Sequence, residues 1–372
     1  MSETAAFGFG EIPSPEPPPI IAPAVITERM SFIGSGSEYF RIWIVNIALT
    51  IVTLGIYSAW AKARRLEYFY RNTRLAGVGF DYHGTPIAIL KGRIIGALLF
   101  GAYTLSSRLG PWYLLGSVLV IAAVMPFLLN RALRFRCANS SYRGVRFAFH
   151  GSTKEAYRVF LLWPLAGVLT LGFLWPLAHR RIKQYEHTFA SYGRTPFGIT
   201  AKVASFYTVY AQAWLIAIAT GLVAGVGFGI AIAGTIAKNG GKAPPTPPAF
   251  STPLMIVVVA VYILGVFAVQ AFVTCRVQSL VWSTTVLGEQ HAFACRLRVR
   301  RYAGLLLTNT LATIVTLGLF VPFAQVRMAK FFVEGMSMIS RGTLDDVAAD
   351  PDVAVSALGE ESVGLFDFDI AF

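Results

Sequence analysis

The sequence predicts an all-α polytopic membrane protein with internal repeats and small cytoplasmic β elements. Of its 372 residues, 55% are hydrophobic and only 14% are charged, whereas about a quarter of a soluble protein is charged. The mean hydropathy is +0.59. Several apolar segments are long enough for a helix to cross the bilayer, which takes about 20 residues. A Thr-Leu-Gly motif occurs in three of them.

The charge pattern divides the chain into a basic body and two acidic tails. Residues 1–38 carry a net charge of −4, residues 39–341 carry +25, and residues 342–372 carry −8. We expect a disordered Pro-rich tail over 1–30, a membrane domain over 31–341 and a disordered tail over 342–372. The first 30 residues lack the basic start and apolar core of a cleavable signal peptide.

Seven apolar segments follow one another along the body, and four of them form two simple hairpins. The first hairpin covers 91–130 and turns at Gly110-Pro111, and the second covers 205–276 and turns in a Gly- and Pro-rich linker. Glycine and proline at these points end helices and form turns. Both pairs are therefore predicted to be transmembrane hairpins.

The other three apolar segments are copies of one motif, in repeat units 31–86, 139–200 and 279–341. Thr53-Leu54-Gly55 and Thr316-Leu317-Gly318 are separated by an offset of 263, which also relates Asn46 to Asn309. Thr170-Leu171-Gly172 is the second copy, which has no matching asparagine. An alanine and an arginine follow in each copy.

A second repeated element has the pattern of a β-strand followed by a turn. Gly77, Phe80 and Tyr82-His83-Gly84 recur as Gly144, Phe147 and Phe149-His150-Gly151 at an offset of 67. Alternating aromatic residues predict a strand. We expect His83 and His150 to be turn or interface histidines whose rings are hydrogen-bonded, because their neighbours offer no set of metal ligands.

These motifs together resemble those of the YjgN-like family of bacterial inner-membrane proteins, a family of unknown function. The resemblance covers about 31–341 and depends on the Thr-Leu-Gly element with its following alanine and arginine, the Tyr-His-Gly-Thr element at 82–85, and Asn309. It implies a multi-pass protein of the bacterial inner membrane. It implies no reaction and no ligand.

The positions of lysine and arginine distinguish between topologies, because these residues are enriched in cytoplasmic loops near span ends. If all seven segments cross, 13 of the 32 Lys and Arg residues are external. If only the two hairpins cross and the three copies enter and return, both termini are cytoplasmic and only Arg108, Lys238 and Lys242 are external. A topology in which the first copy also crosses fits the charges fairly well.

Re-entrant backbone must be buried in protein or face water, so the three copies are predicted to line a common cavity. The candidate cavity-lining residues are Asn46, Thr53, Gly55, Thr170, Gly172, Asn309, Thr316 and Gly318. The alternative is that the asparagines form interhelical hydrogen bonds and the threonines bond helix carbonyls. A common cavity predicts a transport protein, whereas paired asparagines and threonines in a dry interior predict a scaffold.

Basic clusters at the ends of the apolar segments are expected to contact the lipid bilayer and its anionic phospholipid headgroups. The candidates are Arg64, Arg65, Arg180, Arg181, Arg298, Arg300 and Arg301. No nucleic-acid-binding module is present, and no catalytic, cofactor or metal motif is recognisable, so we expect neither an enzyme nor a cofactor. The leading hypothesis is a transport-type protein with a repeat-lined polar cavity, and the rival is a non-transporting scaffold or anionic-lipid-binding protein.

Overall fold

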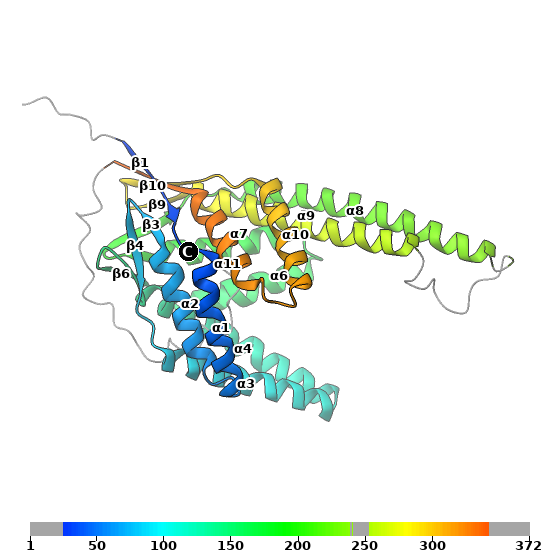
Figure 1. The fold of residues 1–372 in the computed structure, drawn as a ribbon, viewed down its shortest axis with the longest axis horizontal. Helices are drawn as coiled ribbons and strands as arrows, with labels where there is room; N and C mark the ends of the chain where they lie inside the picture. The colour runs from blue at the N-terminus through cyan, green and yellow to red at the C-terminus, as the bar shows by residue number, and fades with distance from the viewer. Residues whose placement is uncertain (1–24, 239, 241–252, 342–372) are drawn as a thin grey trace, which may run out of the picture.

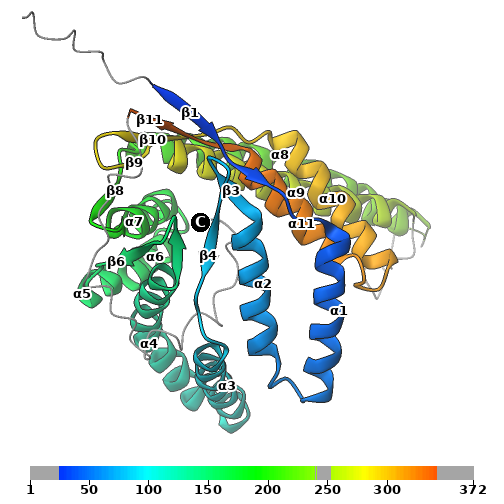
Figure 2. The same ribbon diagram turned by 60° about the vertical axis from the view of Figure 1, so that its left-hand side comes forward.

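The computed structural model describes residues 25–238, 240 and 253–341, and both predicted tails lie outside these residues except for 25–30. In this part of the chain, pairs of helices alternate with short β-strands (Figure 1). The helices radiate from the strands, which gather at one end of the molecule (Figure 2). This arrangement separates an apolar helical part from a compact β-structure.

The strands form one antiparallel sheet that nearly closes into a barrel. Its eleven strands in the described residues are ordered β1-β11-β10-β9-β8-β7-β6-β5-β4-β3-β2. Their bounds are β1 Ile26–Arg29, β2 Ser31–Phe32, β3 Thr73–Leu75, β4 Val78–Tyr82, β5 Ser140–Tyr142, β6 Val145–Phe149, β7 Ala190–Tyr192, β8 Thr195–Ile199, β9 Thr285–Leu287, β10 His291–Cys295 and β11 Met336–Ser340.

One extended segment, residues 26–33, joins the two ends of this sheet. β1 pairs with β11 and β2 pairs with β3. Between them, the Met30 amide donates to the Met336 carbonyl at 3.1 Å, and just after β2 the Ile33 amide donates to the Asn72 carbonyl at 3.0 Å. Because both edges are paired with this segment, few backbone groups are left to bind another chain.

The first three β-hairpins are linked by a repeated tyrosine hydrogen bond. The β3–β4 and β5–β6 hairpins turn through Ala76-Gly77 and Arg143-Gly144, where both residues have positive φ, as the tight turns of twisted hairpins require. Tyr142 Oη donates to the Leu75 carbonyl at 2.8 Å, and Tyr192 Oη donates to the Tyr142 carbonyl at 2.9 Å. The tyrosines therefore link successive hairpins across the interior.

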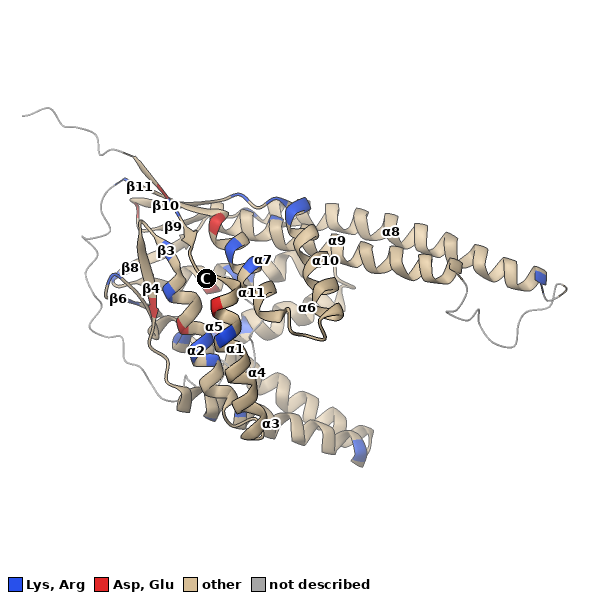
Figure 3. Ribbon diagram, viewed as in Figure 1, with Lys and Arg blue, Asp and Glu red and all other residues tan. Residues whose placement is uncertain are grey.

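Four helices in the described residues are long and apolar enough to cross a membrane. They are α3 Pro86–Leu109, α4 Pro111–Ala138, α8 Val203–Lys238 and α9 Pro253–Ser283. At 1.5 Å per residue they measure about 36 to 54 Å, more than the ~30 Å hydrocarbon core. They form the two hairpins predicted from the sequence, and charged side chains concentrate toward their ends (Figure 3).

The three Thr-Leu-Gly segments form shorter helix pairs. The bounds are α1 Gly36–Val52 with α2 Ser58–Asn72, then α5 Thr153–Tyr157, η1 Arg158–Leu162 and α6 Trp163–Leu169 with α7 Trp175–Thr188, and lastly α10 Val299–Val315 with α11 Val321–Glu334. The first helix of each pair occupies 17 residues, counting α5, η1 and α6 as one continuous stretch. This length corresponds to about 25 Å.

The prediction of an all-α fold with only small β elements was wrong. The strands contain two to five residues each, too few for a clear alternating pattern, and consecutive hairpins are separated in sequence by a helix pair. β8 also contains Pro196, a residue that argues against a strand. The alternation that predicts β4 and β6 is real, but the sheet as a whole depends on contacts between distant segments.

The tyrosine hydrogen bonds between hairpins predict that each of these hydroxyls stabilises the barrel. Removing the hydroxyl in Tyr142→Phe or Tyr192→Phe leaves a buried carbonyl without its donor, which should cost about 1–3 kcal/mol of stability. We expect a lower thermal unfolding midpoint for either variant in detergent. Tyr113→Phe is the control, because Tyr113 is exposed at the start of α4. Equal midpoints for all three variants would contradict the proposed role.

Candidate functional site

A cavity of about 170 Å³ lies inside the barrel, where the ends of four helices meet the strands. Strands β3 to β11 and Met30 contribute the apolar part of its wall, which includes Phe80, Phe147, Phe197 and Phe293. The helical part consists of Tyr70, Arg136, Cys137, Lys183, Glu186, His187, Gln278 and Trp282. The cavity thus has an apolar wall and a charged end.

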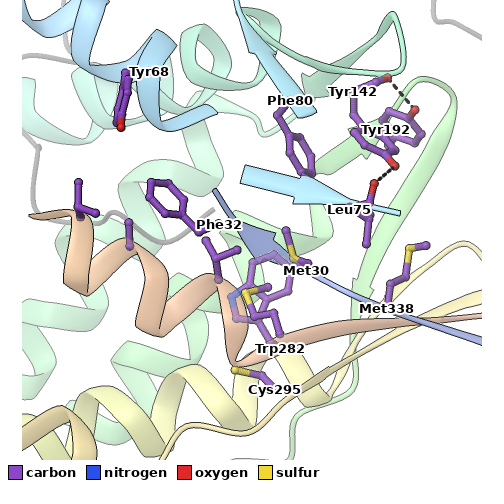
Figure 4. Packing of buried hydrophobic residues seen from close by; sticks show 14 of the residues in the cluster. Met30, Phe32, Tyr68, Leu75, Phe80, Tyr142, Tyr192, Trp282, Cys295 and Met338 are labelled. Carbon is purple, nitrogen blue, oxygen red and sulfur yellow. Dashed lines mark hydrogen bonds between the residues drawn. The ribbon is translucent and has the colours of Figure 1, made fainter. Parts of the chain in front are cut away.

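The apolar wall is built from a row of aromatic rings. Phe80, Phe147, Phe197 and Phe293 come from β4, β6, β8 and β10, the second strands of four successive hairpins. Neighbouring ring centroids are 6.4, 6.4 and 6.2 Å apart, with the rings close to parallel. Figure 4 shows the surrounding cluster, with Phe80 beside Tyr142, and Trp282 near Met30. An apolar or aromatic group would pack against this wall.

The charged end of the cavity is centred on the last turns of α7. Lys183 Nζ lies 2.9 Å from Glu186 Oε2, and Arg136 of α4 also lines the cavity. Burial acts to raise the pKa of the Glu186 carboxyl, but the positive charges of Lys183 and Arg136 outweigh it and hold that pKa below its ordinary value. The carboxyl is therefore ionised at neutral pH.

His187 adds no charge to this end of the cavity at neutral pH. Burial lowers the pKa of its ring to about 4, and the ring stands edge-to-face against Trp282 with centroids 5.1 Å apart. Arg136, Lys183 and the Glu186 carboxylate then leave a net charge of +1. A group with one negative charge would neutralise it.

Tyr185, one residue before Glu186, fixes the position of α7. Its hydroxyl bonds Asn130 Oδ1 of α4 at 3.0 Å and the Ser152 carbonyl at 3.0 Å. Phe149 and Phe160 pack edge-on against the same ring. Because Glu186 and His187 follow on the same helix, these contacts also set the direction of the charged side chains.

The predicted cavity-lining threonines lie at the ends of the short helix pairs that point away from the barrel. Thr53 Oγ1 donates to the Leu49 carbonyl at 2.7 Å and accepts from the Tyr57 amide at 2.9 Å. Thr170 and Thr316 form the same two bonds within their own turns. Each hydroxyl thus bonds a helix carbonyl, as the alternative interpretation of these residues expected, and also accepts from the amide of the residue just before the next helix.

The glycines of the motif stand at the same three turns. Gly55, Gly172 and Gly318 have φ of +93°, +90° and +93°, and a Cβ added to any of them would meet open space. The leucines before them have φ near +50° and are 94 to 99% exposed. Each turn connects the two helices of a different helix pair. None of the motif residues lines the cavity inside the barrel. A cavity shared by the three motifs stays a prediction.

The predicted asparagines lie in the first helix of their pairs, α1 and α10, and both are buried. Asn309 Oδ1 accepts from Arg327 Nη1 at 2.8 Å. Asn46 is 6% exposed, and its Oδ1 has no hydrogen-bond partner. In the second pair, Trp163 occupies the equivalent position, and the Arg181 guanidinium lies 5.5 Å from its ring centroid. An arginine is therefore paired with this position in two of the three units.

The predicted lipid-contacting arginines have different surroundings. Arg64, Arg181, Arg298, Arg300 and Arg301 are exposed. Arg180 instead donates to the Ala201 carbonyl at 2.9 Å and to Gln184, and Arg65 is half-buried. Arg327, the arginine of the third motif copy, and Lys330 were not among these candidates, and they lie with Arg301 on the α10–α11 pair.

The predicted turn histidines are hydrogen-bonded between hairpins, as expected. His83 Nε2 lies 2.8 Å from Ser141 Oγ, and His150 Nε2 lies 3.1 Å from Ser191 Oγ. Within the described residues, no three His, Cys, Asp or Glu side chains are grouped so that they could hold a metal ion. These histidines connect strands of the sheet.

Comparison with known proteins identifies the family. The model of the family DUF898, described as bacterial protein of unknown function, matches residues 27–365. The chain belongs to the DUF898 family. The resemblance noted from the motifs is thereby confirmed, because the chain is also similar to proteins named inner membrane protein YjgN.

These YjgN relatives come from Escherichia coli O157:H7, Escherichia coli K12 and Salmonella typhimurium LT2. Each is 32% identical over 143 to 147 residues, which is 38% of this chain and 36% of the relative. The match therefore spans little more than a third of either protein. No solved structure matches the chain.

The barrel residues of this DUF898 protein were missed in the sequence. The offset of 67 relates Phe80 to Phe147, and it could have suggested that both face one interior. Phe197 lies 50 residues after Phe147, and Phe293 lies 96 residues after Phe197, so no constant offset reveals them. Glu186 forms an ion pair with Lys183, and no motif in the sequence marks either residue as part of a cavity.

Burial of His187 predicts a specific pH dependence of stability in this DUF898 protein. Because its pKa is about 4 in the folded state and about 6.5 in an unfolded chain, the unfolded chain binds the proton first as the pH falls. Stability should therefore decline between about pH 6.5 and 4. In His187→Gln, we expect a smaller drop of the thermal midpoint from pH 7 to pH 5 than in the parent protein. An unchanged drop would exclude this histidine as its source.

Proposed function

We propose that this DUF898 protein is a membrane-anchored binding protein, not an enzyme, whose barrel holds a small amphipathic anion on the cytoplasmic side of the inner membrane. The observation that carries the proposal is the barrel cavity, with its row of aromatic rings and its charged end. The inner-membrane location is supported by the names of the YjgN relatives and by the four membrane-capable helices.

The distribution of basic residues supports the proposed orientation. At the turns of the two long hairpins, which lie farthest from the barrel, the described helices carry only Arg108 and Lys238 as basic residues. The barrel and the adjoining helix ends carry most of the others (Figure 3). Since Lys and Arg near span ends favour the cytoplasm, the barrel is the cytoplasmic part.

The chemistry of the cavity defines the class of ligand. A dry apolar cavity of about 150 Å³ is known to admit a benzene-sized molecule, and this cavity is of similar size at about 170 Å³. The net charge of +1 at its end favours one carboxylate or a similar anion. A ligand with a phenyl or short acyl group and a single negative charge fits both the apolar wall and the charged end of the cavity.

Transport is the second candidate function, and one observation favours it. Asn46 Oδ1 is buried in α1 without a hydrogen-bond partner, and a buried polar group of this kind calls for an explanation. A substrate path beside α1 would provide one. Movement of labelled 4-phenylbutyrate into proteoliposomes would support transport, whereas binding without uptake would support the binding function.

The orientation is tested with reporters fused to the full-length chain. A fluorescent protein fused after Phe372 should fluoresce, and alkaline phosphatase fused at the same position should be inactive, because phosphatase requires the periplasm to fold. Phosphatase inserted in the turn at Gly110 should be active. The opposite pattern would place the barrel in the periplasm and contradict the proposal.

Ligand binding is tested in nanodiscs with 4-phenylbutyrate and its uncharged alcohol, 4-phenylbutanol, by thermal stabilisation of the protein. We expect the acid to bind better than the alcohol, and Arg136→Gln to weaken binding of the acid about tenfold, as expected for loss of one charge-assisted contact. Binding of the alcohol should change little in this variant.

Filling the cavity provides a second, independent variant. Ala190→Leu adds bulk to the cavity wall and should weaken both ligands. Ala292→Leu is the matched control, since Ala292 precedes Phe293 in β10 and alternate residues of a strand face opposite sides. Stabilisation by neither ligand, or equal effects of the two substitutions, would refute the binding site.

A further inference from the structure

A second pocket on the protein, separate from the barrel, lies along the helix pair α10–α11. It is an open groove of about 460 Å³, with Gly304, Leu305 and Phe331 as its floor. Arg301, Arg327, Lys330 and Thr308 complete its lining. All four of these side chains are exposed. Three cations and a hydroxyl around an apolar floor suit a phosphate that is attached to a hydrophobic chain.

The central cation of the groove is held in place by its own helix pair. Arg327 donates from Nη1 to Asn309 Oδ1 at 2.8 Å and from Nη2 to Thr308 Oγ1 at 3.3 Å. Its guanidinium also lies 5.9 Å from the centroid of the Phe320 ring. Glu334 approaches Lys330 at 3.7 Å, a loose contact between exposed groups. Such a contact contributes little and leaves the groove positively charged.

Comparison of the three short helix pairs shows that only the third pair carries three positive charges at these positions. The offset of 263 relates Arg327 to Arg64, but it relates Arg301 to Glu38 and Lys330 to Glu67. The second pair has Arg181, with Glu155 and Gln184 at the other two positions. The same scaffold therefore carries +3 at these positions in the third pair, 0 in the second and −1 in the first.

The position of the groove along the helices corresponds to the surface of the bilayer. Arg327 lies about 9 Å along α11 from its start at Val321, and Arg301 lies about 21 Å along α10 from its end at Val315, so both are set back from the Thr-Leu-Gly turn. The floor residue Phe331 packs with Ala271 and Cys275 of the long helix α9. Counted from Pro253, the start of α9, Ala271 and Cys275 lie about 27 and 33 Å along the helix. The hydrocarbon core is ~30 Å thick, so a helix that enters it at Pro253 leaves it near these two residues.

We infer that the α10–α11 groove binds the phosphate of an anionic phospholipid in the leaflet next to the barrel. Arg301, Arg327 and Lys330 contact the headgroup phosphate, and the acyl chains extend along the apolar surface toward Leu317. This site is independent of the barrel cavity and of the small anion proposed there.

The inference is tested by native mass spectrometry of the whole protein released from nanodiscs of phosphatidylglycerol and phosphatidylcholine. We expect the parent protein to retain phosphatidylglycerol preferentially. Arg301→Gln combined with Lys330→Gln should reduce this preference about thirtyfold, since each basic residue near a membrane surface contributes about 1 kcal/mol and the variant loses two of them. Both side chains are exposed, and an unchanged thermal midpoint will verify that the variant folds.

Arg74→Gln combined with Arg194→Gln is the matched control, because it removes two exposed charges from hairpins of the barrel. It should keep the lipid preference. Lipid-stripped protein is also titrated with inorganic phosphate, which should compete poorly with phosphatidylglycerol. An equal loss in the two double variants, no lipid preference in the parent, or strong competition by free phosphate would each overturn the proposed lipid site.

Discussion

Closure of the sheet by residues 26–33 is the constraint on which the rest of the structure depends. Every described helix pair starts and ends at a strand of this sheet, so the ring of strands determines where each pair leaves the barrel. The same closure brings Met30 and strands from β3 to β11 around one cavity. Without the pairing of β1 with β11, the sheet would have two open edges, and Met30 would no longer be held at the cavity wall.

The Thr-Leu-Gly turns reverse each short helix pair and satisfy most of their own backbone donors. In the first turn, the amides of Leu54, Gly55 and Ile56 bond carbonyls of the same turn, and the amide of Tyr57 bonds the Thr53 hydroxyl. The other two turns repeat this scheme. Because the donors are satisfied internally, such a turn can expose a leucine to lipid at little cost.

The sequence predicts the membrane part of this protein better than the β part. Long apolar runs locate α3, α4, α8 and α9, because a span needs only length and composition. The Thr-Leu-Gly motif likewise marks three turns, because its glycine has a positive φ that other residues avoid. These signals are local, so a single sequence contains them.

The candidate sites were largely invisible for the opposite reason. Glu186 and Arg136 approach one cavity from different helices, and Arg301 and Arg327 face one groove from the two arms of a hairpin. The cavity and the groove form only when segments that are distant in the sequence pack together. The repeat offset of 263 nevertheless could have indicated the groove, because it aligns Arg301 with Glu38 and Lys330 with Glu67. The third repeat is therefore basic at two positions where the first is acidic.

The place of β11 in the ring has a consequence for biosynthesis. Residues 26–29 leave the ribosome early, yet their partner strand, Met336–Ser340, is translated more than 300 residues later. During that interval both edges of the growing sheet are without their final neighbour, while the long hairpins are already available for insertion. Anchoring in the bilayer can thus precede completion of the ring, and a chain that stops before residue 336 would be inserted but remain open.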